Sequence, residues 1–368
     1  MQVSKEIMDL KPYVPGKPIE ETKLEYGLSQ VSKLASNENP MGVSPMVQEA
    51  LVQRIGELNR YPDAGCVALK KAFSNYFDIG SEKITFGNGS NELIDLLIRI
   101  YCEKGDSILT TQSAFIAYQI CAQAARVKVD HVDYDPVSLT VSAEDIISSY
   151  TTNHKIVFIA NPNNPTGTFL ERSEVEKIIH FFSTKKDVLL VFDEAYVEYA
   201  RSEKYVSALK YLDQNSNLVV LRTMSKVYGI AGLRLGAVFA DQEVVDFVDR
   251  VRNPFNINEL AQVAGIAALQ DQEYIRASQR MNWNGLDFFY RELNNLSLHY
   301  WPSETNFVLV RFERNVSSIN QRLLEKGVIV RPVTNYGLHD CLRISVGTEE
   351  ENRLAMKCLR EVLNEVKK

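Results

Sequence analysis

The fold of this chain is most constrained by three short apolar runs, at residues 156–160, 188–192 and 218–221. A strand with one face in water alternates apolar and polar residues, so unbroken runs predict strands that are buried on both faces. Residues 171–182, between the first two runs, have the spacing of a helix. This alternation predicts an α/β domain with a mostly parallel sheet covered by helices.

The 368 residues are enough for one large domain or two medium ones. Residues 1–44 are rich in proline and charge and predict an irregular N-terminal arm. Residues 45–250 carry the alternating pattern and form the expected large domain. Residues 251–368 begin with a long helical region and continue with short strand-like segments, which predicts a smaller α+β domain.

Composition and charge exclude several classes of protein. With a net charge of −6, the chain lacks the excess of basic residues that nucleic-acid-binding proteins usually carry. No apolar run approaches the roughly 20 residues that span a membrane. The N-terminus lacks the apolar segment of a secretory signal. The five cysteines form no C-x-x-C pair, which argues against a metal site or a disulfide framework and favours the reducing cytoplasm.

Polar side chains follow each of the three apolar runs. Asn164 comes after the first, Asp193 and Tyr196 after the second, and Lys226 after the third. In open α/β sheets, ligands bind at the carboxyl ends of the strands, so these four side chains are expected around one crevice. A glycine-rich turn at residues 87–90, between a strand and a helix, predicts a phosphate site because helix N-termini bind anions.

Lys226 is the first candidate for a reactive lysine. It lies among glycines and hydroxyls and near a second cation, Arg234. Desolvation or a neighbouring cation lowers the pKa of a lysine, whose neutral amine then attacks carbonyl compounds. An amine, a carboxylate, a phenol, an amide and a phosphate cradle together match the needs of pyridoxal 5'-phosphate (PLP).

These motifs resemble those of the fold-type I PLP-dependent aminotransferases of the aspartate aminotransferase superfamily. Within it the chain is most similar to the histidinol-phosphate aminotransferases of the class-II family, over nearly its whole length. The matching segments are residues 37–40, 60–63, 86–90, 161–167, 193–196, 223–236, 330–332 and 342–347.

The resemblance implies a role for each candidate residue. Lys226 would bind the cofactor aldehyde and then carry a proton, and Asp193 would pair with the ring nitrogen, so that with Tyr196 they form the catalytic set. Tyr196 and Asn164 would bond the phenolate oxygen of the cofactor. The remaining cofactor contacts would be Gly89, Ser90, Asn91, Phe115, Ser225, Arg234 and, across a homodimer interface, Tyr61.

The same resemblance implies the substrates. Arg343 would bind the α-carboxylate of L-glutamate, while Arg331, with Tyr13 from the partner chain, would bind a substrate phosphate. The implied reaction is transamination between L-glutamate/2-oxoglutarate and imidazole acetol phosphate/L-histidinol phosphate, in histidine biosynthesis. Aromatic amino-acid transamination and decarboxylation of a phosphorylated amino acid remain as alternatives.

Several of the candidate residues can be explained without a role in binding or catalysis, or depart from the family pattern. The proline-rich turn explains Asn161 or Asn163 as well as Asn164. Asn91 stands where an acidic residue is common in the family, which leaves the bracing of the phosphate turn open. Residues 112–114 also depart from the family pattern just before Phe115. A nucleotide-binding protein without covalent chemistry is disfavoured, because the glycine-rich turn lacks the G-x-G-x-x-G spacing.

Overall fold

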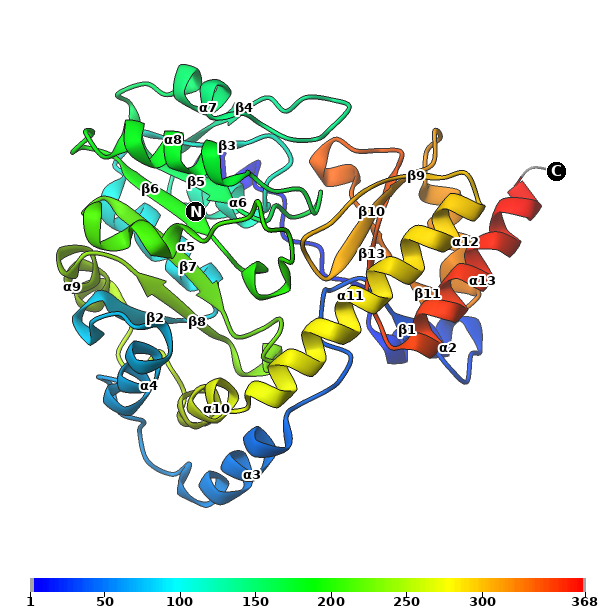
Figure 1. Ribbon diagram of the computed structural model, residues 1–368, viewed down its shortest axis with the longest axis horizontal. Coiled ribbons are helices and arrows are strands. Elements are labelled where there is room, and N and C mark those ends of the chain that lie inside the picture. The colour runs from blue at the N-terminus through cyan, green and yellow to red at the C-terminus, as the bar shows by residue number, and fades with distance from the viewer. Residues whose placement is uncertain (1–2, 367–368) are drawn as a thin grey trace.

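The computed structural model describes residues 3–366 and is built around a seven-stranded sheet (Figure 1). In spatial order the strands are β2 (Ile84–Asn88), β8 (Leu235–Phe239), β7 (Leu218–Thr223), β6 (Leu189–Asp193), β5 (His154–Ala160), β3 (Ser107–Thr111) and β4 (Lys128–Val132). Strands β7, β6, β5, β3 and β4 are parallel, whereas β8 runs antiparallel to both of its neighbours. The predicted α/β domain with a mostly parallel sheet is confirmed.

Helices cover both faces of this sheet, so the central strands are buried on both sides. In β7, Leu218 and Val220 pack into one core layer while Val219 and Leu221 pack into the other. The first layer is closed by α3 (Pro45–Arg54), α4 (Val67–Phe77), α7 (Ala143–Ser149), α8 (Arg172–Phe182) and α10 (Glu259–Gln270). The second is closed by α5 (Ser90–Tyr101), α6 (Ala117–Ala124) and α9 (Gln242–Val251).

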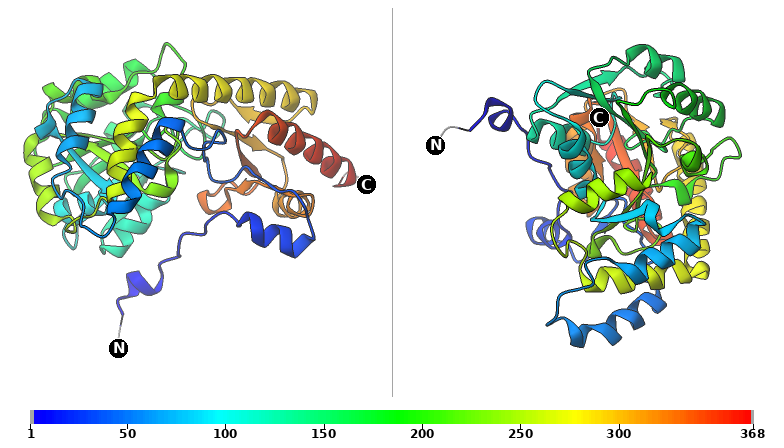
Figure 2. Two further views of the ribbon diagram at one scale, coloured as in Figure 1. Left: turned by 90° about the horizontal axis from the view of Figure 1, so that it is seen from below. Right: turned by 90° about the vertical axis from the view of Figure 1, so that its left-hand side faces the viewer.

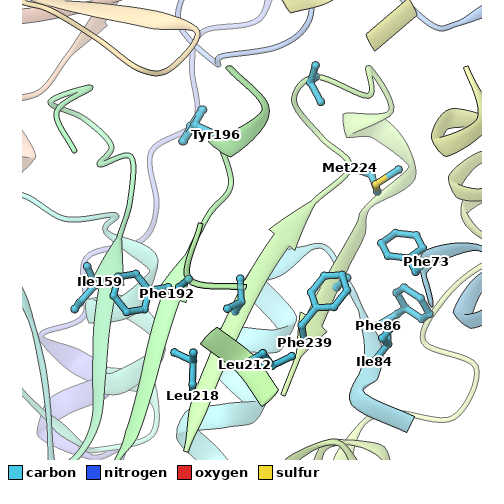
Figure 3. Packing of buried hydrophobic residues seen from close by; sticks show 14 of the residues in the cluster. Phe73, Ile84, Phe86, Ile159, Phe192, Tyr196, Leu212, Leu218, Met224 and Phe239 are labelled. Carbon is cyan, nitrogen blue, oxygen red and sulfur yellow. The ribbon is translucent and has the colours of Figure 1, made fainter. Parts of the chain in front are cut away.

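The first core layer ends where the polar site begins. In Figure 3, Phe192 lies on the sheet, whereas Tyr196 lies in the turn beyond the end of the same strand. The strand supplies a rigid base because its residues are fully packed, and Tyr196 extends this core layer to the wall of the site.

The smaller α+β domain is built on a four-stranded antiparallel sheet. Its strands, in spatial order, are β12 (Arg331–Pro332), β13 (Cys341–Ser345), β10 (Phe307–Arg311) and β9 (His299–Trp301). Its helices are α12 (Ser317–Glu325), α13 (Glu349–Val366) and the long α11 (Gln272–Asn295), which runs from the large domain across the small one (Figure 1).

The N-terminal arm contacts both domains. It contains α1 (Lys5–Met8), α2 (Ile19–Tyr26) and β1 (Ser32–Lys33), and β1 pairs in parallel with β11 (Val328–Ile329) of the small domain. Figure 2 shows the arm reaching past the body of the molecule, and there Gln123 of α6 donates to the carbonyl of Glu6 (2.8 Å).

The packing of α10 bears on the division between the domains. Ala261, Ala264 and Ala268 of this helix belong to the core layer of the large domain. We therefore propose that the division follows residue 270 rather than residue 250. No helix within residues 3–366 has the length and apolar composition needed to cross a membrane, and the same residues contain no metal-binding cluster of His, Cys, Asp or Glu side chains.

Candidate active site

The carboxyl ends of β5, β6 and β7 border a cavity of about 380 Å³ between the two domains. Most of the residues expected from the sequence line it: Tyr13, Ser90, Asn91, Phe115, Asn164, Asp193, Tyr196, Ser225, Lys226, Arg234, Arg331 and Arg343. Gly89 lies directly behind this wall. Tyr61 lies outside the cavity of its own chain, where 82% of it is exposed and its ring stacks on Phe255 at 4.6 Å.

Lys226 lies in the tight turn that follows β7. Its Nζ is 3.4 Å from the carbonyl oxygen of Ser36 and 5.6 Å from the centre of the Tyr196 ring. Burial, followed by the charge of Arg343, lowers the pKa of Lys226 to about 8. Roughly a fifth of the amine is therefore neutral near physiological pH, far more than for a lysine in water, and the neutral form is the nucleophile.

Asp193 is the last residue of β6, and 5% of it is exposed. Its Oδ2 accepts a hydrogen bond from the Tyr118 hydroxyl (2.8 Å), and its Oδ1 accepts one from the Ala195 backbone N–H (3.2 Å). Burial raises the pKa of Asp193 to about 6, and the Tyr118 hydrogen bond opposes that rise. The carboxylate is therefore poised to pair with a cation that enters the cavity.

Tyr196 and Asn164 occupy the wall between Asp193 and the small domain. The Tyr196 hydroxyl accepts a hydrogen bond from Asn37 Nδ2 (2.9 Å), and burial raises the pKa of Tyr196 to about 12. Asn164 accepts a hydrogen bond from Arg343. A neutral phenol and an amide next to each other suit an oxygen atom that carries partial negative charge.

The geometry separates Asn164 from its two neighbours in the proline-rich turn. Asn161 is fully buried, and its Oδ1 accepts from the Leu170 backbone N–H (2.9 Å). Asn163 donates to the Thr166 hydroxyl (2.8 Å). Of the three, only Asn164 lines the cavity, so only its side chain is placed to contact a ligand there.

The glycine-rich turn forms an anion cradle at the N-terminus of α5. Gly89 has φ +78° and ψ 165°, a backbone conformation that favours glycine, and Arg234 Nη2 lies 2.2 Å from where a Cβ would be. Arg234 also lies 3.4 Å from the Ser225 hydroxyl. The free N–H groups of the helix start, a guanidinium and a hydroxyl thus point to the same space.

The glycine-rich turn is held in place by Glu92, although the family pattern pointed to an acidic residue at the position of Asn91. Its Oε2 accepts from the Asn88 backbone N–H (2.6 Å) and from Asn256 Nδ2 (2.8 Å), and Asn256 also bonds the Phe86 carbonyl (3.2 Å). Asn91 itself faces the cavity. The acid that fixes the turn is therefore the next residue along the helix, a shift that the spacing alone did not reveal.

Arg343 reaches the cavity from β13. Leu342 and Ile344 on either side of it pack into the small-domain core, and Arg343 faces the opposite way. It donates to the Ala35 carbonyl (2.8 Å), and its Nε is buried without a partner. A buried guanidinium without a carboxylate partner is suited to bind an anionic ligand.

Arg331 lies beside the N-terminal arm, where it donates to the Val14 carbonyl (2.6 Å) and lies 5.6 Å from the ring of Tyr13. This Tyr13 belongs to the same chain, whereas the resemblance assigned it to the partner. Residues 10–14 lie beside β12 of the same chain, and the assignment of Tyr13 to the partner's site stays a prediction.

Sequence reasoning gave no role to several other residues of the site. Asn37, with φ +54°, holds Tyr196 and is itself held by the Ser345 hydroxyl (2.7 Å). Tyr118 and Tyr336 contribute from α6 and from the segment after β12. Asn37 carried a weak signal in the sequence, because asparagine adopts a left-handed backbone conformation more readily than most residues. A tyrosine on an apolar helix face carries no comparable signal.

Comparisons with known proteins agree along the whole chain. The family model for aminotransferase class I and II matches residues 29–359. Histidinol-phosphate aminotransferase of Bdellovibrio bacteriovorus is 47% identical, with 100% of this chain and 99% of that protein covered. Histidinol-phosphate aminotransferase 1 of Psychrobacter arcticus is 41% identical, with coverage of 98% and 94%. Among solved structures, that of histidinol-phosphate aminotransferase from Sinorhizobium meliloti in complex with pyridoxal-5'-phosphate has a TM-score of 0.89 at 27% identity, covering 99% of this chain and 98% of that one.

Proposed function

The chain belongs to the class I and II aminotransferases, and we propose that it transfers an amino group between L-glutamate and imidazole acetol phosphate. The products are 2-oxoglutarate and L-histidinol phosphate, and the step belongs to histidine biosynthesis. The proposal is supported by the names of the full-length relatives. The observation that carries it is the convergence of a nucleophilic lysine, a buried carboxylate, an anion cradle and two further arginines on one cavity.

The residues present fit PLP. Gly89 lets the Arg234 guanidinium lie against the start of α5, and the buried Asp193 carboxylate lines the same cavity as Lys226. Lys226 would hold the aldehyde, Asp193 the ring nitrogen, and Tyr196 with Asn164 the phenolate oxygen. The phosphate would be held by the start of α5 with Gly89, Ser90, Asn91, Ser225 and Arg234, and Phe115 would stack on the ring.

When bound, PLP supplies an aldehyde that exchanges with amines and a ring that withdraws electrons from the substrate carbon. The side chains perform the remaining tasks. The Lys226 amine, with its pKa of about 8, both takes and returns a proton near neutral pH. Arg343 fixes the substrate's α-carboxylate, and Arg331 fixes a phosphate or a second carboxylate at the mouth of the cavity.

We also infer a homodimer in the cytoplasm. Large apolar side chains are exposed along α3 and the segment that follows it, among them Val52 (74%), Ile55 (62%) and Leu58 (46%). Tyr61 extends from the same surface and would reach the cofactor phosphate of the partner subunit. An apolar patch of this kind is typical of an interface between subunits. The cytoplasmic location is supported by five cysteines that are all free thiols.

Steady-state kinetics with both substrate pairs tests the proposal. A double-displacement reaction, in which glutamate reacts first and the keto substrate second, gives parallel double-reciprocal lines, and intersecting lines would contradict it. A side-by-side assay should give a much higher kcat/KM for L-histidinol phosphate than for L-phenylalanine. The reverse order would replace the proposed substrate with aromatic amino acids, and release of CO₂ from a phosphorylated amino acid would indicate a decarboxylase.

A further inference from the structure

The hydroxyl of Tyr118 contacts Asp193, and Tyr118 itself does not line the cavity. Tyr118 is fully buried on α6, and its Oη donates to Asp193 Oδ2 at 2.8 Å. The ring is fixed by Phe158, on which it stacks at 4.8 Å and 11°, and by Phe115, which it meets edge-on at 5.9 Å. The hydroxyl therefore has a single direction, and that direction is toward the carboxylate.

We propose that Tyr118 is a positioning residue that keeps the Asp193 carboxylate ionised and oriented for the cofactor's ring nitrogen. The proposal rests on the proposed function, because the ring nitrogen is that of PLP. Tyr118 does not touch the reacting atoms, since Asp193 lies between them. With the Ala195 N–H on Oδ1, the Tyr118 hydroxyl gives each carboxylate oxygen one fixed donor.

The environment of Asp193 explains why a donor is needed there. Burial favours the neutral acid and raises the pKa of Asp193 to about 6, and the adjacent Glu194 acts in the same direction. Lys226 opposes the rise, but only weakly compared with the Tyr118 and Ala195 hydrogen bonds. The other titratable groups facing this region, Tyr196 and Tyr336, are neutral phenols whose pKa values are raised by burial. A protonated Asp193 could not pair with a pyridinium.

The phenol is suited to this task because it cannot compete for the charge. Burial and the Asp193 charge raise the pKa of Tyr118 well above its usual value, so the hydroxyl stays a donor at every working pH. A water in its place would be free to reorient, whereas the stacked ring is not.

The test compares Tyr118→Phe with Tyr205→Phe, which removes a hydroxyl bonded to the Asn161 carbonyl (2.9 Å) rather than to Asp193. PLP affinity of the apoenzyme is measured by fluorescence from pH 5 to 8.5. We expect Tyr118→Phe to weaken binding about tenfold at pH 7, as expected for one lost hydrogen bond to a charged group. The acid limb of the binding profile should move upward by about one pH unit, because Asp193 is then protonated more readily. Tyr205→Phe should leave the acid limb in place.

A second variant keeps the inference open to refutation should Tyr118→Phe fold poorly. A fluorinated tyrosine at position 118 is a stronger donor of the same shape, and it should move the acid limb downward. If the wild-type protein binds PLP and neither Tyr118 variant moves the acid limb of the binding profile, the positioning role is overturned. Failure of the wild-type apoenzyme to bind PLP would instead overturn the proposed function.

Discussion

Lys226 lies in a cavity where burial and a second cation both oppose its charge. Desolvation is the largest cause that lowers the pKa of Lys226 to about 8, and the charge of Arg343 is the next largest. Glu38 and Asp193 raise this pKa. At residue scale, the reactivity of this amine is thus set by groups from the arm, the large domain and the small domain together. Arg343 would both bind the substrate and help to keep the lysine reactive.

The first prediction concerns this coupling. Capture of PLP by the apoenzyme, followed by absorbance, should rise with pH through about 8 and level off above it, because only the neutral amine reacts. Arg343→Met removes a cation that lowers the Lys226 pKa, so the midpoint should move to higher pH. Arg311→Met, which removes a half-buried arginine that pairs with Asp340 and does not line the cavity, is the control. A midpoint unchanged by Arg343→Met would show that Arg343 does not act on Lys226.

The second prediction concerns the stability of the apoenzyme. Asp193 has a higher pKa when folded, about 6, than its usual 3.8, so the folded chain binds this proton more tightly than the unfolded chain. That contribution is present at low pH and is lost as pH rises through about 6. Asp193→Asn should therefore stabilise the apoenzyme at pH 7.5 by up to about 3 kcal/mol, at 1.36 kcal/mol per pKa unit. The gain should fall below about 1 kcal/mol at pH 4 in urea unfolding, and a gain equal at both pH values would refute the linkage.

The third prediction separates the two substrate arginines. Arg331→Ala should lower kcat/KM for L-histidinol phosphate about 100-fold, the size of a lost charge-assisted interaction, and that for L-phenylalanine less than threefold. Phenylalanine has no phosphate for Arg331 to bind. Equal losses for both substrates would indicate that Arg331 supports the arm through the Val14 carbonyl instead of binding the phosphate.

At element scale, a buried ionic cluster joins the two turns that carry the candidate site. Arg222 of β7 pairs with Glu194 (2.9 Å) and Glu198 (3.1 Å), which flank Tyr196 in the turn after β6. The Tyr228 hydroxyl, two residues beyond Lys226, bonds Glu198 as well (3.3 Å). The cluster lies behind the cavity, so it holds the turns without entering the chemistry.

The fourth prediction follows from the burial of this cluster. Arg222→Met should destabilise the protein by about 3–5 kcal/mol at pH 8, because two carboxylates lose their partner. Burial already raises the pKa of both carboxyls, so the variant should protonate them and recover part of its stability at pH 5. Arg353→Met, in an exposed pair with Glu349, should change stability by less than about 1 kcal/mol. A pH-independent loss in Arg222→Met would argue against unpaired carboxylates as the cause.

The elements differ in how well the sequence predicted them. Strands β5, β6 and β7 were recognised because burial on both faces leaves an unbroken apolar run. Edge strand β4 was not, because Lys128, Asp130 and His131 are exposed and interrupt any apolar run. The antiparallel direction of β8 was beyond sequence reasoning too, since strand orientation is set by connections and not by composition. Tyr118 was missed for a related reason: its role depends on a contact between residues 75 positions apart.

At the scale of the whole molecule, the site would be complete only in the proposed homodimer, and the fifth prediction tests this with hybrid subunits. Lys226→Ala and Tyr61→Phe should each be nearly inactive alone and remain folded. If Tyr61 serves the partner's site, a hybrid of the two variants contains one site with both Lys226 and Tyr61. Random reassembly at equal amounts should then restore roughly a quarter of wild-type activity, because half of the dimers are hybrids with one intact site each. If Tyr61 served its own chain, where it now stacks on Phe255, no site in the hybrid would be intact and activity would not return.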